Sequence, residues 1–406
     1  MTVPGPAVAV RRRTGRIRRA VPRLLLVLAV VIVVVMAFLA GGGWYFAGQI
    51  RSDGLAISPS STDYDLSVVG FGHGIVTLRE APGHPRDEAV RKPYVYGLQW
   101  PGGSGILGAA ASTASDGSVG RPLEVKVGVP PAPGMRAGLD REVYADPAAA
   151  YGVSFRDVSY GCAAGTCPAW YVPGTAKTWA IVVHGKGATR TEGLRALGPV
   201  LRARMPALLI TYRNDVGAPR DPSGYYRYGA TEWHDLDNAV EYAVSRGARQ
   251  VVLFGFSMGG SIVASFLRNS AHAGVARGVM LDSPMLAFRS TVDYGASKRR
   301  LPVVGLPIPK PLTWTAETIA GHQYGIAWKA IDYLTGTWLR VPALVFHGTA
   351  DDTIPIRTSD TFAKANPHLV HEIRVAGASH VESWNADPAR YAVATAAFLD
   401  SVRSQG

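Results

Sequence analysis

A serine between two glycines, at the end of an apolar run, is the residue in this sequence best placed to act as a nucleophile. The run is VVLFGFSMGG at residues 251–260, and the serine is Ser257. The spacing G-x-S-x-G arises by chance about 0.3 times in a glycine-rich chain of this length, so it needs support from its surroundings. Here a strand-like segment precedes Ser257 and a helix-like segment, SIVASFLRN, follows it. That order is typical of a sharp turn that exposes a nucleophilic serine at the edge of a sheet.

A serine hydroxyl needs a base, and the base needs an acidic partner that orients its ring. The segment VPALVFHGTADDTIP ends a predicted strand with Asp351 and Asp352, and HEIRVAGASHVESW ends the next one with His380. At a serine turn of this kind the expected order along the chain is serine, acid, histidine. Asp282, in GVMLDSPM, also ends a predicted strand. We therefore expect His380 to be the base, and the residues alone leave the acid open among these three aspartates.

Attack on a carbonyl carbon also requires N–H donors for the oxyanion that forms. One predicted donor is the backbone N–H of Met258, directly after the serine. The other is expected in the loop after an earlier strand, in IVVHGKGATR, where it is the backbone N–H of Lys186. The ammonium group of Lys186 is expected to be solvated or paired with an acid.

The elements that would position these residues begin at Tyr151. From there strand-like and helix-like segments alternate, which predicts a mostly parallel sheet with helices on both faces. The interval from about 285 to 339 breaks this rhythm and is where we expect a short cap insertion. Before Tyr151, residues 51–150 carry short strand-like runs separated by Gly, Pro and Ser, which predicts a small β-rich region of unknown role.

The amino terminus predicts a membrane anchor. Residues 1–23 form a basic tail without acidic residues, followed by an uncharged apolar run over residues 24–46 that is long enough to cross a bilayer as a helix. The net charge of the whole chain is +12, and without the tail's seven arginines it is +5. The excess basic charge therefore indicates how the chain is oriented in a membrane, rather than nucleic-acid binding. These arginines are Arg11, Arg12, Arg13, Arg16, Arg18, Arg19 and Arg23.

The positive-inside rule then predicts a single-pass protein of the cytoplasmic membrane, with its amino terminus inside and the rest of the chain extracytoplasmic. A cleaved signal peptide is the alternative, but the apolar run is longer than usual for one. The two cysteines, Cys162 and Cys167 in GCAAGTCPAW, would face a compartment where disulfides persist. We expect them to pair across a turn, with two free thiols as the alternative. No further Cys or His lies nearby, so we expect no metal there, and no cofactor elsewhere.

Together, HGKG, GFSMGG, HGTADDTIP and GASH resemble the motifs of the α/β-hydrolase superfamily, in the branch of serine aminopeptidase-like and monoglyceride-lipase-like enzymes. The resemblance covers residues 151–406 and implies an α/β-hydrolase fold for them. In that branch the acid is the aspartate of H-G-x-x-D-x-x-[VI]-P, which falls on Asp351. The resemblance further implies that Ser257 attacks an acyl carbon, that His380 relays the proton, and that water releases the acyl-enzyme.

These expectations combine into a membrane-anchored serine hydrolase that cleaves an ester-type bond in a small or lipid-like acyl ester. A serine peptidase or aminopeptidase of the same fold is the first alternative, and it would need a site for a substrate amino group. A non-catalytic binding domain on a hydrolase scaffold is the second. An intact order of Ser257, Asp351 and His380 argues against that second alternative.

Overall fold

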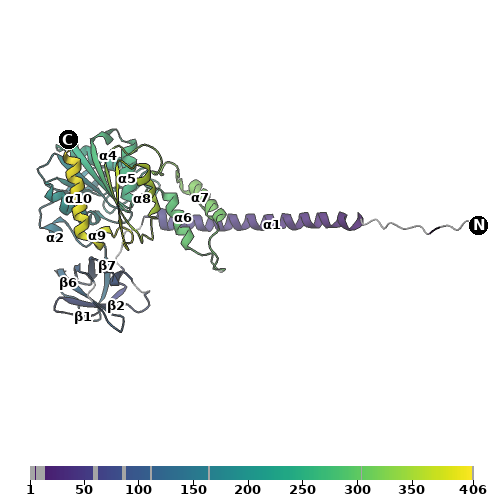
Figure 1. The fold of residues 1–406 in the computed structure, drawn as a ribbon, viewed down its shortest axis with the longest axis horizontal. Helices are drawn as coiled ribbons and strands as arrows, with labels where there is room; N and C mark the ends of the chain where they lie inside the picture. Colours follow the sequence, from purple (N-terminus) through teal and green to yellow (C-terminus); the bar gives the residue numbers. More distant parts are fainter. Residues whose placement is uncertain are drawn as a thin grey trace, which may run out of the picture. The chain divides into compact units, whose positions relative to one another are not determined.

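The computed structural model describes residue 5 and residues 14–57, 63–84, 88–109, 112–162, 165–302 and 304–404 (Figure 1). The chain divides into two compact units, which are described separately. One unit comprises Met1–Asp53 and Arg299–Gly325, and the other comprises Gly54–Lys298 and Ile326–Gly406.

In the described part of the first unit, helices α1 (Thr14–Gln49) and α7 (Lys310–Tyr324) pack against each other. Within the described residues, the segment Pro22–Leu55 is the only helix long and apolar enough to cross a membrane. The predicted span over residues 24–46 lies inside this helix. Most of the predicted basic tail, including Arg11, Arg12 and Arg13, lies outside the described residues.

The second unit contains an eight-stranded sheet in the order β15-β14-β13-β12-β10-β11-β9-β8. The strands from β10 to β15 run parallel, and the β8–β9 hairpin joins them antiparallel through β9. The central strands are buried on both faces, as their unbroken apolar runs predict. The strands are β8 (Arg156–Cys162), β9 (Gly165–Val172), β10 (Thr178–Val183), β11 (Ala207–Ile210), β12 (Gln250–Phe256), β13 (Ala276–Asp282), β14 (Ala343–Gly348) and β15 (Val370–Val375).

Helices cover both faces of this sheet, as the alternating sequence pattern predicts (Figure 1). Helices α3 and α10 pack together and share one apolar core cluster with the sheet, while α4 and α5 pack together on the sheet as well. The helices of this unit are α2 (Pro147–Tyr151), α3 (Leu194–Arg202), α4 (Trp233–Ser245), α5 (Met258–Asn269), α6 (Phe288–Lys298), α8 (Arg357–Ala365), α9 (Ser383–Ala386) and α10 (Pro388–Ser404). The interval 285–339, where no clean period was visible, contains α6 and α7.

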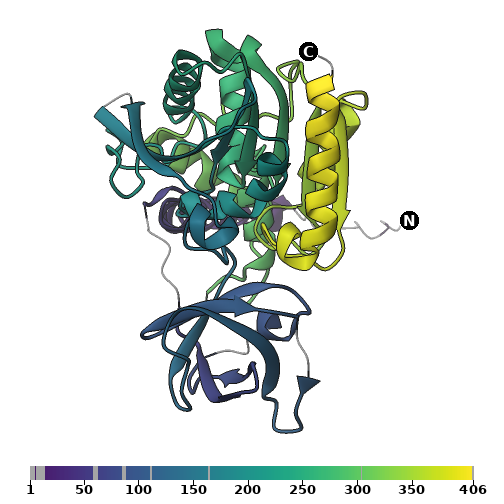
Figure 2. The same ribbon diagram turned by 90° about the vertical axis from the view of Figure 1, so that its left-hand side faces the viewer.

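The predicted β-rich region forms a closed antiparallel barrel with its own apolar core (Figure 2). Its strands follow the order β2-β1-β7-β3-β4-β6-β5, and β6 also pairs with β2, which closes the sheet. Closure leaves few unpaired strand edges, because most backbone groups bond around the ring. The strands are β1 (Leu66–Gly72), β2 (Ile75–Glu80), β3 (Tyr96–Trp100), β4 (Gly103–Leu107), β5 (Ser112–Thr113), β6 (Val119–Gly128) and β7 (Arg136–Asp140).

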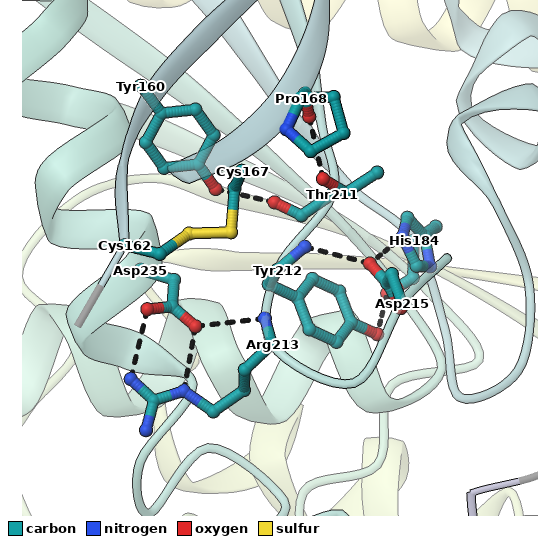
Figure 3. The surroundings of a disulfide bond; sticks show 10 residues. All are labelled: Tyr160, Cys162, Cys167, Pro168, His184, Thr211, Tyr212, Arg213, Asp215 and Asp235. Carbon is teal, nitrogen blue, oxygen red and sulfur yellow. Dashed lines mark hydrogen bonds and ion pairs between the residues drawn. A yellow bond between two sulfur atoms is a disulfide. The ribbon is translucent and has the colours of Figure 1, made fainter. Parts of the chain in front are cut away.

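The two cysteines are joined by a disulfide at the turn of the β8–β9 hairpin (Figure 3). Cys162 is the last residue of β8 and Cys167 lies in β9, with their Cα atoms 5.7 Å apart. The pairing expected from the sequence is therefore present, and neither cysteine is a free thiol.

Candidate active site

The serine turn joins β12 to α5, as the sequence pattern predicts. Ser257 has φ 47° and ψ −116°, a strained conformation for a residue with a side chain. The turn is held by hydrogen bonds from the Ser257 N–H to the Asp282 carbonyl (3.0 Å) and from the Met285 N–H to the Ser257 carbonyl (2.9 Å). A Cβ atom at Gly259 would lie only 2.2 Å from the Val183 carbonyl oxygen, so glycine is required for α5 to approach β10.

Three side chains from the ends of three strands form a continuous hydrogen-bonded chain. His380 Nε2 lies 2.9 Å from Ser257 Oγ, and His380 Nδ1 lies 2.9 Å from Asp351 Oδ2. Ser257 and His380 are half-buried, while Asp351 is buried. The structure therefore brings together the serine, the histidine and the aspartate that the sequence singled out.

The Asp351 carboxylate is held by donors on both of its oxygens. Its Oδ1 accepts from the backbone N–H groups of Thr353 (2.9 Å) and Ile354 (2.8 Å), and its Oδ2 receives His380. Burial would raise the pKa of Asp351, but hydrogen bonds from His347 and His380 outweigh burial and hold that pKa well below its usual range. Asp351 is thus ionised, the state needed to orient and stabilise an imidazolium.

The other two candidate acids lie elsewhere. Asp352 is exposed, and its Oδ1 lies 3.3 Å from both the Thr353 hydroxyl and the Ser379 hydroxyl. Asp282 is buried and its Oδ1 accepts a hydrogen bond from Ser383 (2.8 Å). Burial raises the pKa of Asp282 to about 6.

His347 is a contributor to the site that the sequence analysis did not assign. It is fully buried near the end of β14, with Nδ1 2.7 Å from Ser359 Oγ and Nε2 3.2 Å from both Asp351 Oδ2 and the Ile354 carbonyl. It thereby contacts the same carboxylate oxygen as His380 and helps to hold the acid in place. Its position four residues before Asp351, in HGTADD, was the available signal.

The HGKG loop lies beside the serine. Lys186 lines the same cavity as Ser257 and His380. The N–H of Gly185 donates to the buried Glu192 carboxylate (2.6 Å), so this amide is already engaged inside the protein. Met258 is the first residue of α5, where backbone N–H groups lack intrahelical acceptors. Lys186 and Met258 thus flank the serine, and their role as oxyanion donors stays a prediction.

The first histidine of this loop, His184, forms a buried ion pair with Asp215 (Figure 3). His184 Nε2 lies 2.9 Å from Asp215 Oδ2, and Nδ1 lies 2.9 Å from the Gly185 carbonyl. Burial lowers the pKa of His184, but Asp215 and these hydrogen bonds outweigh burial and raise the pKa to about 9. Asp215 lies in a turn, and its Oδ2 also accepts from the Tyr212 N–H (2.7 Å). Asp235, in the first turn of α4, accepts from the Arg213 guanidinium (2.7 Å).

This ion pair predicts a pH dependence of stability. Because the pKa of His184 is raised on folding, its contribution is fully present below about pH 6.5 and is lost as the pH rises through about 9. We expect the free energy of unfolding to fall by roughly 3 kcal/mol over that interval. Urea unfolding of the detergent-solubilised chain at several pH values measures this slope.

Two variants isolate the ion pair. Asp215→Asn should flatten the slope, because the partner that raises the pKa of His184 is lost. Burial, together with Glu192 and Asp140, raises the pKa of Glu142 to about 8, so this group adds a slope of the same sign. Glu142→Gln should therefore remove only the part of the pH-dependent slope that Glu142 contributes, and leave the part from His184. An unchanged slope in Asp215→Asn would contradict the assignment.

A buried arginine connects the HGKG loop to the His380 loop. Arg195 on α3 donates from Nη1 to the Val381 carbonyl (2.8 Å) and to Asn385 Oδ1 (2.9 Å), and its Nη2 lies 3.6 Å from Glu192 Oε1. Since Glu192 holds Gly185 and Val381 directly follows His380, one guanidinium fixes both loops. Only 1% of Arg195 is exposed.

We expect Arg195→Met to lower the free energy of unfolding by about 3–5 kcal/mol, because it leaves the buried Glu192 carboxylate without its cation. Arg202→Met, an exposed position on the same helix, is the matched control and should change stability by less than about 0.5 kcal/mol. Thermal or urea unfolding measures both. Equal effects of the two substitutions would contradict the role given to Arg195.

The barrel is bound to the element that carries His380. The Glu382 carboxylate accepts from Lys92 Nζ (2.7 Å) and from the Tyr96 hydroxyl (2.9 Å) of the barrel. Asn385 Nδ2 also donates to the Val95 carbonyl (2.8 Å). These contacts place barrel residues against the mouth of the site.

A cavity of about 910 Å³ opens at Ser257 and His380. One wall comes from the HGKG loop and the other from the barrel and the segment after it. The barrel side carries several carboxylates, including Asp65, Asp140 and Glu142. Within the described part of the chain, no group of three or more His, Cys, Asp or Glu side chains could hold a metal ion.

The family model described as "Alpha/beta hydrolase family" matches residues 180–394, just over half of the 406 residues. A search of curated protein sequences finds no significant match. Among solved structures, an esterase of Pyrococcus furiosus aligns with a TM-score of 0.48 and 18% identity, over 64% of this chain and 97% of that chain. A membrane phospholipase A, described as a bacterial virulence factor, aligns with a TM-score of 0.43 and 19% identity, over 63% of this chain and 89% of that chain. An esterase of Rhodococcus sp. ECU1013 aligns with a TM-score of 0.40 and 18% identity, over 62% of this chain and 100% of that chain. At these identities the likeness concerns the fold alone.

Proposed function

Because this chain belongs to the alpha/beta hydrolase family, we propose that it is a serine hydrolase that cleaves a carboxylic ester through an acyl-enzyme. The observation that carries this proposal is the hydrogen-bonded chain of Ser257, His380 and Asp351, with both contacts at 2.9 Å. A serine in this arrangement is activated by the imidazole, which is itself oriented by the carboxylate.

In the proposed reaction, Ser257 Oγ attacks the acyl carbon while His380 Nε2 takes the hydroxyl proton. The resulting oxyanion receives hydrogen bonds from the N–H groups of Met258 and Lys186, each worth about 3 kcal/mol in comparable sites. Collapse of the tetrahedral intermediate expels the alcohol, which takes the proton from His380. Water then attacks the acyl-enzyme by the same route, and the acid and free Ser257 are formed.

We further propose that the barrel shapes the substrate site. The barrel contributes Gln99 and Asp65 to the lining of the cavity that holds Ser257. Lys92 and Tyr96, at the contact with Glu382, would fix this wall relative to His380. On this proposal the acyl or alcohol group of the substrate lies between the HGKG loop and the barrel.

A peptidase or aminoacyl esterase is the second candidate, and one observation favours it. A substrate amino group would need an anionic partner. The carboxylates of Asp65, Asp140 and Glu142 line the cavity on the barrel side. A substrate with a cationic amine near its scissile bond would be stabilised there.

A fluorophosphonate probe and a substrate panel test these proposals on the detergent-solubilised full chain. We expect one covalent label per chain, located by mass spectrometry on the peptide that contains Ser257. We also expect p-nitrophenyl esters to turn over faster than aminoacyl anilides. Faster turnover of the anilides would favour the peptidase, and folded protein without any label would favour the non-catalytic binding domain.

We also propose that α1 anchors the enzyme in the cytoplasmic membrane, with the catalytic unit extracytoplasmic. The length and composition of Pro22–Leu55 support the anchor, and the arginines before it support the orientation. The Cys162–Cys167 disulfide is consistent with an oxidising compartment. A carboxyl-terminal alkaline phosphatase fusion should be active in cells. An inactive fusion that is present in the membrane would contradict the orientation.

A further inference from the structure

The unit that contains α1 also presents apolar side chains to its surroundings at a second place. In the loop between Arg299 and Lys310, the described residues 300–301 and 306–307 pair through their backbones. Arg300 and Pro307 form a β-bridge, and the Leu301 N–H donates to the Leu306 carbonyl (2.7 Å). At the tip of this loop Val304 is 61% exposed and Leu306 is 59% exposed.

This loop leads into α7, which lies directly against the end of the apolar run of α1. A Cβ atom on Gly42 would lie 2.9 Å from a methyl group of Leu312, and one on Gly43 would lie 2.7 Å from the Thr315 methyl group. The small residues of α1 thus allow α7 to pack closely, as is common between helices in membranes. Trp314, in the same turns of α7, is 67% exposed.

The two helices run in the same direction. Thr315 contacts α1 at Gly43, and nine residues later the Tyr324 ring lies under the Arg51 guanidinium, with 6.0 Å between the guanidinium carbon and the ring centroid. From Thr315 onward α7 therefore follows α1 away from the apolar run. The residues of α7 before Thr315 consequently lie beside the apolar run of α1, on the amino-terminal side of Gly43.

Basic residues flank the apolar tip on both sides. Arg299 and Arg300 precede it and Lys310 follows it, and all three are exposed. Arg299 pairs with Asp53, on the segment that follows α1, which ties the base of the loop to the anchor (2.5 Å). An apolar tip between basic side chains matches the boundary of a bilayer, where phosphates lie above acyl chains.

We propose that this loop and Trp314 insert into the leaflet at the carboxyl end of the apolar run of α1, as a second contact with the same bilayer. The inference rests on the proposed membrane anchoring by α1. Val304, Leu306 and Trp314 enter the boundary between headgroups and acyl chains, while Arg300 and Lys310 bind lipid phosphates. The segment from Arg299 to α7 is thereby held at the lipid surface.

Depth-dependent fluorescence quenching tests this inference on the full chain in nanodiscs that contain phosphatidylglycerol. The only two native cysteines are joined in a disulfide, so a single introduced cysteine can be labelled with nitrobenzoxadiazole. The test positions are Val304→Cys and Leu306→Cys. Val33→Cys on α1 is the control for the anchor, and Val216→Cys is a matched valine of the sheet-containing unit, 79% exposed.

Lipids with a spin label on the acyl chain should quench the probe at residues 304 and 306 by about two-fold or more, since interfacial elements lie about 5–10 Å deep. The probe at residue 216 should not be quenched. Quenching at residue 33 together with unquenched probes at 304 and 306 would overturn the inference and leave the anchor intact. No quenching at residue 33 would instead overturn the anchor, and the inference with it.

Discussion

Replacing Ser257 with alanine is expected to lower kcat/KM for a p-nitrophenyl ester by about 10⁴-fold or more. The alanine removes the hydroxyl oxygen that lies 2.9 Å from His380 Nε2. The fold should remain, because the turn is held by backbone hydrogen bonds of residue 257 rather than by its side chain. Initial rates with purified protein, together with fluorophosphonate labelling, measure the effect.

Ser245→Ala is the matched control for this substitution. Ser245 is an exposed serine at the end of α4, whose hydroxyl donates to the Tyr242 carbonyl of its own helix. It should retain both the activity and the covalent label. If Ser257→Ala retained its label while folded, another residue would have to be the nucleophile, and the proposed reaction would be wrong.

The second large effect is expected from the acid. Asp351→Asn should lower kcat by about 10⁴-fold, because the amide cannot stabilise the imidazolium and favours the wrong ring tautomer of His380. The pKa of Asp351 is held well below its usual range, so the native carboxylate stays ionised across the acid side of the profile. The loss should therefore persist at every pH from about 5 to about 9, as steady-state kinetics across that range would measure.

Asp282→Asn distinguishes the two candidate acids. The amide oxygen of asparagine can still accept the hydrogen bond from Ser383, so we expect a change in kcat of less than about ten-fold. A larger loss in Asp282→Asn than in Asp351→Asn, with both variants folded, would transfer the role of the acid to Asp282.

Much of the fold could be predicted because its signals are local. The buried strands are unbroken apolar runs, such as TWAIVVH, and α5 covers the segment SIVASFLRN that was predicted to be helical. The turn at Ser257 was predictable for the same reason, since strand, glycines and helix lie within twenty residues. The order of Ser257, Asp351 and His380 could be recognised because parallel strands bring their carboxyl ends to one edge.

Other parts of the site depend on residues distant in sequence. The barrel was visible only as a set of short strands, because its closure depends on the pairing of β2 with β6, more than thirty residues apart. Nothing local in the sequence connects Asp215 to His184, which lies 31 residues away along the chain. The contacts of Arg195 with Val381 and Asn385 join residues 186 and 190 positions apart, so no local pattern predicts them.

The sequence by itself determined the elements and the family resemblance and indicated the candidate residues for the chemistry, because periodicity and motif spacing act over a few residues. Only the tertiary structure decided that Asp351 rather than Asp282 reaches His380, that His347 supports it, and that a barrel wall with carboxylates faces Ser257. Such contacts depend on how separate elements pack. A hydrogen bond of 2.9 Å between side chains 123 residues apart leaves no local trace in the sequence.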